Sequence, residues 1–293
     1  MKRGDTAKPP GSSPAAPALP MIAGALVFLA LFRAPLAGTL RLWWTDAESA
    51  HGLLLAPVAL ILAWRAGLVA EPRRQAWSGL LLLLLAVAMR LAGGLAAEQY
   101  TQRLSVLVAA GGLVVWTRGR AQLARWWLPG GLLLLSLPLP ELILAGLSFP
   151  LQLKASELGA ALLSWRHVPV TLAGNVIELP GRSLFVTEAC GGLRSITALL
   201  ALGLLVGGLW LRTTWARAVL AAAAIPVAML LNGIRIFVTG FSVHFISPGL
   251  GEGVMHYTEG WGMFVAALLT LAALAWLLLQ AEKLRGEGVR AVA

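Results

Sequence analysis

Long apolar stretches separated by short polar segments dominate the chain. A helix crosses a bilayer with roughly 20 apolar residues, and stretches near that length predict about eight membrane-spanning helices. The fourth predicted span is short, and Pro138 and Pro140 interrupt the fifth, which is expected to be kinked or re-entrant. The pattern predicts an all-α polytopic membrane protein. Its predicted spans are residues 20–38, 52–70, 77–97, 103–117, 127–147, 190–211, 216–239 and 260–280.

Composition supports this class. Hydrophobic residues make up 58% of the 293 residues and charged residues 12%, whereas soluble domains carry about 25% charged residues. Too few charged side chains are present to cover a soluble surface, so a cytosolic enzyme and a disordered protein are excluded. In a soluble chain the net charge of +10 would indicate a nucleic-acid partner. Here it is attributed to Lys and Arg in cytoplasmic loops, and no nucleic acid is expected.

Charge also predicts the orientation. If the N-terminus is cytoplasmic, eight crossings place most of the 23 Lys and Arg residues on the cytoplasmic side. Residues 1–19, rich in Pro, Ser and Ala, are expected to be a disordered cytoplasmic lead-in, and residues 281–293 a cytoplasmic tail. The first apolar stretch lacks the cleavage site of a signal peptide and is interpreted as a retained helix. Residues 20–280 form the predicted membrane domain.

One sizeable segment, residues 141–189, is expected on the exported side as a cap. In its first half apolar residues recur at helical spacing, with Lys154 and Glu157 on the polar side, which predicts an amphipathic helix at the membrane interface. Its second half has β-branched runs separated by turn residues, which predicts a short β-hairpin leading into the sixth span.

Cys190, the single cysteine, stands in TEACGGLRS at the predicted start of the sixth span. It allows neither an intramolecular disulfide nor a multi-cysteine metal site. The partial positive charge of a helix N-terminus and the cation of Arg194 one turn on would stabilise a thiolate nucleophile. Gly191 and Gly192 would leave backbone N–H groups free for an oxyanion. The alternatives are a cysteine that packs as a small hydrophobic residue and glycines that serve helix packing.

Arg235 lies in LLNGIRIFVTG near the outer end of the seventh span. A charge at the centre of a membrane helix costs about 2.5–3.5 kcal/mol on insertion scales, so such a residue usually faces a polar cavity or a partner. The alternative is that Arg235 extends to the lipid headgroups. Asn232 precedes it by three residues on the same helical face, which favours a buried polar site.

His256 occurs in GEGVMHYTEGW just before the eighth span, with Glu252 and Glu259 close enough in sequence to orient it. His244, in the same exported region, is a competing candidate. In the predicted topology Cys190, Arg235 and His256 all lie at the non-cytoplasmic boundary, on consecutive helices. A thiol, a cation and an acid or base at one depth are the parts needed for acyl transfer through a thioester.

These motifs resemble those of the exosortase/archaeosortase family of membrane cysteine transpeptidases. The resemblance rests on ACGGLRS, NGIRIF and MHYTEGW in the family's order, and on the earlier block WWTDAESAHGLLLAPVALILAW. It implies a catalytic triad of Cys190 as nucleophile, Arg235 as stabiliser of the oxyanion or thiolate, and His256 as general acid/base. Supporting positions are Arg194, Asn232, Gly191, Gly192 and, in the substrate groove, His51. Many members have Ser where Gly191 stands, a departure that concerns the subclass.

The resemblance also implies the substrate and the place of action. Substrates would be exported proteins with a C-terminal sorting signal, as in PEP-CTERM proteins: a short motif, a transmembrane helix and a basic tail. Cleavage would be followed by transfer to a surface acceptor. The enzyme would be a multi-pass protein of the bacterial inner (plasma) membrane, with cytoplasmic termini and its site on the periplasmic or extracellular face.

Two other function classes fit a polytopic chain. A transporter or channel would need polar residues through the depth of several helices, and most predicted spans have none. A scaffold protein would use the exported cap as a docking surface. No cofactor is predicted and no metal site, because potential ligands are few and no phosphate-binding glycine motif precedes a polar helix.

Overall fold

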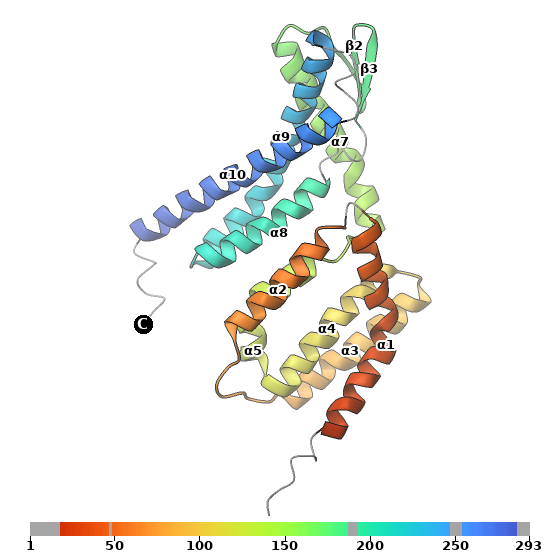
Figure 1. Cartoon of the computed structure of the whole chain (residues 1–293), viewed down its shortest axis with the longest axis vertical. Helices are drawn as coiled ribbons and strands as arrows, with labels where there is room; N and C mark the ends of the chain where they lie inside the picture. Colours follow the sequence, from red (N-terminus) through yellow and green to blue (C-terminus); the bar gives the residue numbers. More distant parts are fainter. Residues whose placement is uncertain (1–17, 47–48, 187–192, 247–253, 286–293) are drawn as a thin grey trace, which may run out of the picture.

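The computed structural model of the chain describes residues 18–46, 49–186, 193–246 and 254–285. It is an elongated, mostly helical molecule with one small sheet near one end (Figure 1). In chain order its elements are α1 (Ala18–Thr45), α2 (Gly52–Ala66), α3 (Ala76–Leu95), α4 (Gln99–Arg118), α5 (Arg120–Arg125), α6 (Trp127–Leu135), α7 (Glu141–Trp165), β1 (Thr171–Ala173), β2 (Val176–Leu179), β3 (Arg182–Phe185), α8 (Leu193–Trp210), α9 (Thr214–Phe245) and α10 (Val254–Leu284).

Within the described residues, 4 helices are long and apolar enough to cross a membrane: Leu26–Thr45 of α1, α3, α9 and Gly262–Leu284 of α10. Two apolar helices, α2 and the Ser195–Trp210 part of α8, are shorter. The class of a helical membrane protein is thereby confirmed. The count of eight crossings stays a prediction, because only these helices meet the length and composition expected of a span.

The predicted fifth span, 127–147, is not one helix. α6 ends at Leu135 and α7 begins at Glu141, so the helix is interrupted where Pro138 and Pro140 were expected to interrupt it. The interruption contains Pro138 and Pro140, which lack the N–H that would continue the helical ladder. Side chains from other parts of the chain contact the backbone carbonyl groups that the end of α6 leaves without a helical partner. Trp43 Nε1 donates to Ser136 O at 2.8 Å, and His51 Nε2 lies 3.1 Å from Leu135 O.

The segment predicted as a cap contains a helix followed by strands, but it differs from the prediction in two respects. The sheet has three antiparallel strands in the order β1-β2-β3, one more than a hairpin. The helix α7 is not cleanly amphipathic, because polar residues occupy both of its faces. Lys154 and Glu157 form an exposed ion pair at 2.7 Å, while Gln152 and Ser156 are buried. These buried groups bond within the protein, so α7 packs as a structural helix.

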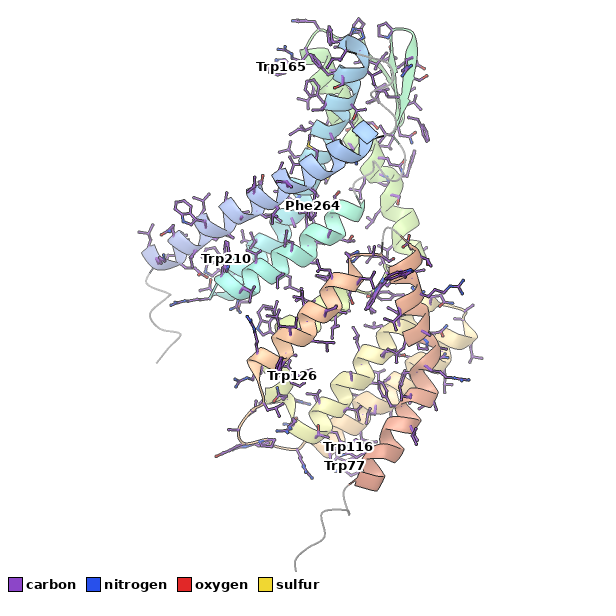
Figure 2. The ribbon with its side chains drawn as sticks, viewed as in Figure 1. Trp77, Trp116, Trp126, Trp165, Trp210 and Phe264 are labelled. Carbon is purple, nitrogen blue, oxygen red and sulfur yellow. The ribbon has the colours of Figure 1, made fainter. Side chains whose placement is uncertain are left out.

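The N-terminal half is built on the α3–α4 hairpin, in which the two helices pack closely along their length. Ala86 and Ala109 are fully buried at this contact, and small side chains let helix backbones approach each other. Trp77 and Trp116 lie at the end of the hairpin, far from Trp165 of α7 (Figure 2). α1 packs on α4, and α2 packs on α6.

The C-terminal half is a bundle of α8, α9 and α10 with α7 and the sheet against the far part of α9 (Figure 1). Its core combines bulky side chains such as Leu199, Leu220 and Leu271 with small ones such as Ala224 and Ala275. The two halves meet where α6 packs against α8.

Several helix ends carry basic residues that were predicted to face the cytoplasm, and these helix ends lie close to one another. Arg125 Nε donates to Ala66 O at 2.5 Å, which joins α5 to the end of α2. The Arg217 guanidinium at the start of α9 lies 4.9 Å from the Trp127 ring centre of α6. Buried Glu282 of α10 bonds the turn between α8 and α9. The beginnings and ends of these helices therefore lie on one side of the molecule (Figure 1).

Candidate functional site

Three helices meet around a small cavity of about 30 Å³. The cavity is lined by residues just after the start of α8 and by residues in the middle of α9. α10 contributes residues that lie two to three turns after its beginning. Six of the nine lining residues are apolar, and the polar side chains come from Ser195, Asn232 and Arg235. The complete lining is Ser195, Leu199, Ala228, Leu231, Asn232, Arg235, Met263, Phe264 and Ala267.

Asn232 and Arg235 face this cavity because they are one helical turn apart on α9. Asn232 is only 6% exposed, and the Nε atom of the half-buried Arg235 is itself buried. A guanidinium in a site of low polarity interacts strongly with negative charge, and a carboxamide both donates and accepts hydrogen bonds. The pair is therefore suited to a polar group that carries or develops negative charge, such as a carbonyl oxygen during acyl transfer.

Several predicted site residues lie outside the described part of the chain. Cys190, Gly191 and Gly192 belong to residues 187–192, which directly precede α8. Arg194 and His256 lie within α8 and α10, but their side chains are also outside it. Along the backbone, Arg194 directly precedes Ser195 of the cavity. His256 is seven residues before Met263, about two helical turns, and so occupies the same helical face.

The other two histidine candidates lie elsewhere. His51 stands at the start of α2 in the N-terminal half, where its Nε2 atom lies 3.1 Å from Leu135 O. His244 lies in the last turn of α9, edge-on to the ring of Phe245 with 4.6 Å between the ring centres. Neither residue lines the cavity around Arg235. The predicted place of His51 in a substrate groove has no counterpart among the cavity-lining residues.

Sequence reasoning missed a larger groove that adjoins this cavity. It has a volume of about 270 Å³ and runs between α7 and α9. Asn232 lines both spaces, so the groove and the Arg235 cavity adjoin at this residue. The signal that points to it is the helical spacing of apolar residues in 151–158, which was assigned to a membrane surface. The groove is lined by Leu151, Lys154, Ala155, Leu158, Pro226, Met229, Leu230 and Asn232.

A buried polar network fixes the chain just before the Cys190 segment. Asn175 Nδ2, in the turn between β1 and β2, donates to Gln152 Oε1 at 3.0 Å and to Val186 O at 3.1 Å. The Val186 N–H donates to Asn175 O at 2.9 Å. Both backbone groups of Val186 are thus held by one residue. The sequence reveals Asn175 only as a turn residue, since its partners are distant along the chain.

No three His, Cys, Asp or Glu side chains gather as metal ligands in the part of the chain that the structure describes.

Comparison with known families gives one match. The profile of a family described as transmembrane exosortase matches residues 43–273, well over half of the chain. The match includes α8, α9, the part of α10 that lines the cavity, and the segment with Cys190. No curated protein and no solved structure matches the chain.

Proposed function

Since the chain belongs to the transmembrane exosortase family, we propose that it is a membrane-embedded cysteine transpeptidase. It cleaves the C-terminal sorting signal of exported proteins through a thioester acyl-enzyme, and it transfers the shortened protein to a cell-surface acceptor. The substrate presents a short motif followed by a transmembrane helix and a basic tail. A substrate held in the same bilayer raises the effective concentration of its scissile peptide near the thiol.

In this mechanism the Cys190 thiolate attacks the scissile carbonyl carbon. Arg235 and the backbone N–H groups at Gly191 and Gly192 stabilise the oxyanion that forms. His256 donates a proton to the leaving amine as the C–N bond breaks, which leaves a thioester on Cys190. The acceptor nucleophile then attacks the thioester, His256 takes its proton, and the thiolate is released. Arg194 assists in stabilising the thiolate, and Asn232 binds the substrate backbone.

The proposed orientation follows the basic residues. The helix ends near Arg125, Arg217 and Glu282 lie on one side of the molecule, which we assign to the cytoplasm of a bacterial inner membrane together with both termini. α6 and α7 together make one of eight crossings, and the Arg235 cavity lies toward the exported face. The sheet and the far part of α7 form the exported cap.

One observation carries the proposal: Arg235 and Asn232 of α9 share a cavity with Ser195 of α8 and Met263 of α10. These helices carry, or directly follow, the segments that contain Cys190 and His256. A transporter pathway would instead require polar side chains along the depth of the bundle, and the core between α8, α9 and α10 is built of Leu and Ala.

The test replaces Cys190 with Ala and follows processing of an exported protein that carries such a signal. We expect processing to stop while the variant still inserts and accumulates in the membrane. In the unmodified enzyme, hydroxylamine should release a thioester-linked adduct, and mass spectrometry should locate it on Cys190. Normal processing by Cys190→Ala would reject the mechanism. Transport that survives the substitution would favour a transporter, and ordinary reactivity of Cys190 toward iodoacetamide would favour a scaffold.

A further inference from the structure

The loop of residues 67–75, which joins α2 to α3, is fixed against the region where α4 meets α5 (Figure 1). The Val69 N–H donates to Gln122 Oε1 at 2.8 Å, and Gln122 Nε2 donates to Gly67 O at 3.2 Å. Gln122 is fully buried, so water does not compete for these hydrogen bonds. The structure therefore holds this loop in one arrangement, which a loop that only carries charge would not require.

The same arrangement brings arginines from different parts of the chain together. The backbone carbonyl of Arg73 lies so close to Gly119 that a β-carbon at this glycine would overlap it. Arg118 and Arg120 flank Gly119, and Arg120 Nη2 donates to Ser78 Oγ at 3.2 Å. Three arginines therefore meet where α4 ends and α5 begins.

Further arginines of the same surface lie at the end of α2 and in the loop, and the positive charge is not balanced by carboxylates. Within the described part of the chain none of these arginines forms an ion pair, and exposed Glu71 of the same loop pairs with none of them. Like charges held close together repel each other, so an anion that binds between them is stabilised. We call this set the basic surface: Arg65, Arg73, Arg74, Arg118, Arg120 and Arg125.

Exposed tryptophans indicate the depth of the basic surface in the membrane. Trp64, next to Arg65, is 84% exposed, and Trp77 in the first turn of α3 is 81% exposed. Trp116 lies beside Trp77 (Figure 2). Tryptophan rings favour the headgroup level of a bilayer, and α3 is long and apolar enough to cross one. The arginines beside these rings therefore lie among lipid headgroups.

We propose that the basic surface is a binding site for the headgroup of an anionic phospholipid in the leaflet at this end of the molecule. A guanidinium binds a phosphate through two parallel hydrogen bonds, and basic clusters beside membrane helices attract anionic headgroups. Charge alone would also attract a soluble acidic protein or a nucleic acid, but the tryptophans place the arginines at the lipid. The site lies apart from the Arg235 cavity, so this inference does not depend on the proposed function.

The first experiment measures lipid binding to the purified full chain in detergent by native mass spectrometry. The probes are phosphatidylglycerol, which is anionic, and phosphatidylethanolamine, which is zwitterionic. We expect the unmodified protein to bind phosphatidylglycerol about tenfold more tightly. The double variant Arg73→Gln, Arg74→Gln should lose this preference, because each arginine near an anionic bilayer contributes about fivefold to binding. Only the backbone of residue 73 contacts Gly119, so the loop should keep its place.

The matched control is the double variant Arg41→Gln, Arg166→Gln, which removes the same charge from two exposed positions outside the basic surface. It should bind both lipids as the unmodified protein does. Equal losses in the two double variants, or equal affinity of the unmodified protein for both lipids, would overturn the proposal. Displacement of phosphatidylglycerol by an equal concentration of an RNA oligonucleotide or an acidic peptide would assign the surface to a soluble partner instead.

The second experiment separates a fixed site from net charge. Gln122→Leu keeps every arginine but removes both hydrogen bonds that hold the loop 67–75. We expect its affinity for phosphatidylglycerol to fall several-fold, and the lipid should raise its unfolding temperature less than that of the unmodified protein. Unchanged affinity would show that charge suffices without the fixed loop, which would overturn a built site. If Gln122→Leu does not fold, the arginine variants decide the proposal by themselves.

Discussion

The two ends of the α8–α9–α10 bundle use buried polar residues in opposite ways. At one end Glu282, 1% exposed, accepts hydrogen bonds from Thr213 N at 2.8 Å and from Arg212 N at 3.2 Å, and also from the Thr213 hydroxyl. These donors belong to the turn between α8 and α9, so the carboxylate ties three helices together. At the other end Asn232 and Arg235 face a cavity.

The difference shows which end is built for stability and which for chemistry. Glu282 satisfies backbone N–H groups at a helix start, and both of its carboxylate oxygens accept hydrogen bonds from the protein. Asn232 and Arg235 instead border a cavity of about 30 Å³. Buried polarity in a membrane protein therefore indicates a functional site only where it borders free space.

The largest expected effect concerns two arginines of the same helix. Arg235→Lys keeps the charge but loses the planar guanidinium, and removal of one oxyanion donor typically costs 10²–10³-fold in rate. We expect kcat/KM for substrate processing to fall by about that factor, with little change in thermal stability. Processing by purified protein in detergent or liposomes measures it.

The matched control is Arg217→Lys. Arg217 lies at the opposite end of α9, where its Nε atom donates to Leu211 O at 3.0 Å and its guanidinium contacts the Trp127 ring. This variant should process substrate at nearly the normal rate. Equal losses in the two variants would contradict the distinction between the ends.

Glu282→Ala should lower stability and leave the processing rate unchanged, the opposite of the effect expected for Arg235→Lys. It leaves the part-buried N–H groups of Arg212 and Thr213 without their acceptor, and the loss of such hydrogen bonds costs about 1–3 kcal/mol. We expect stability to fall by about that amount, measured by thermal unfolding in detergent, while the rate per folded molecule stays constant. Lys283→Ala changes the exposed neighbour and should alter neither. A rate loss in Glu282→Ala that exceeds its loss of folded protein would contradict a purely structural role.

Sequence alone predicted the helical membrane class and the family, because apolar runs and the motifs around Cys190, Arg235 and His256 are local signals. It also predicted that Asn232 and Arg235 share a face, since helical spacing fixes that. It did not predict the role of Glu282, which was assigned to a cytoplasmic tail although α10 continues to Leu284. Its partners are some 70 residues away along the chain, and no local pattern reports such a contact.

The burial of Gln152 and the groove between α7 and α9 were not predicted, for a similar reason. Buried Gln152 breaks the amphipathic pattern expected of 141–165, because its partner Asn175 arrives from the sheet. The α7–α9 groove depends on close contact at Gly159 and Gly233. Glycines in two helices do not disclose that they face each other until the fold brings them together.

His51→Ala tests whether a predicted substrate-groove residue is instead structural. The His51 imidazole contacts the backbone carbonyl of Leu135 at the end of α6. Both residues are distant in sequence from those that line the Arg235 cavity. Loss of that contact should lower stability by about 1–2 kcal/mol, with an unchanged KM. His51→Gln, which retains an N–H donor, should recover part of the loss. A raised KM at normal stability would return His51 to the substrate groove.

The smallest effect is expected at Glu98, which caps α4 far from the site and therefore tests the N-terminal half as pure scaffold. Its carboxylate accepts hydrogen bonds from Tyr100 N at 2.8 Å and Thr101 N at 2.6 Å. Burial raises the pKa of Glu98, but the bonds from Thr101 and Tyr100 and the charge of Arg103 outweigh it, so the pKa lies below its ordinary value of 4.5. The ionised form thus stabilises the folded state.

This contribution should be complete above about pH 4.5, the pKa of the unfolded chain, and should vanish as the pH falls through the lower pKa of the folded protein. Glu98→Ala should therefore cost about 1 kcal/mol at pH 7, as other helix caps do, and progressively less in acid. Thermal unfolding of both proteins from pH 7 down to pH 3 measures the difference. A gap that stays constant across this range would mean that the cap does not depend on ionisation, and altered processing at pH 7 would mean that the N-terminal half takes part in the chemistry.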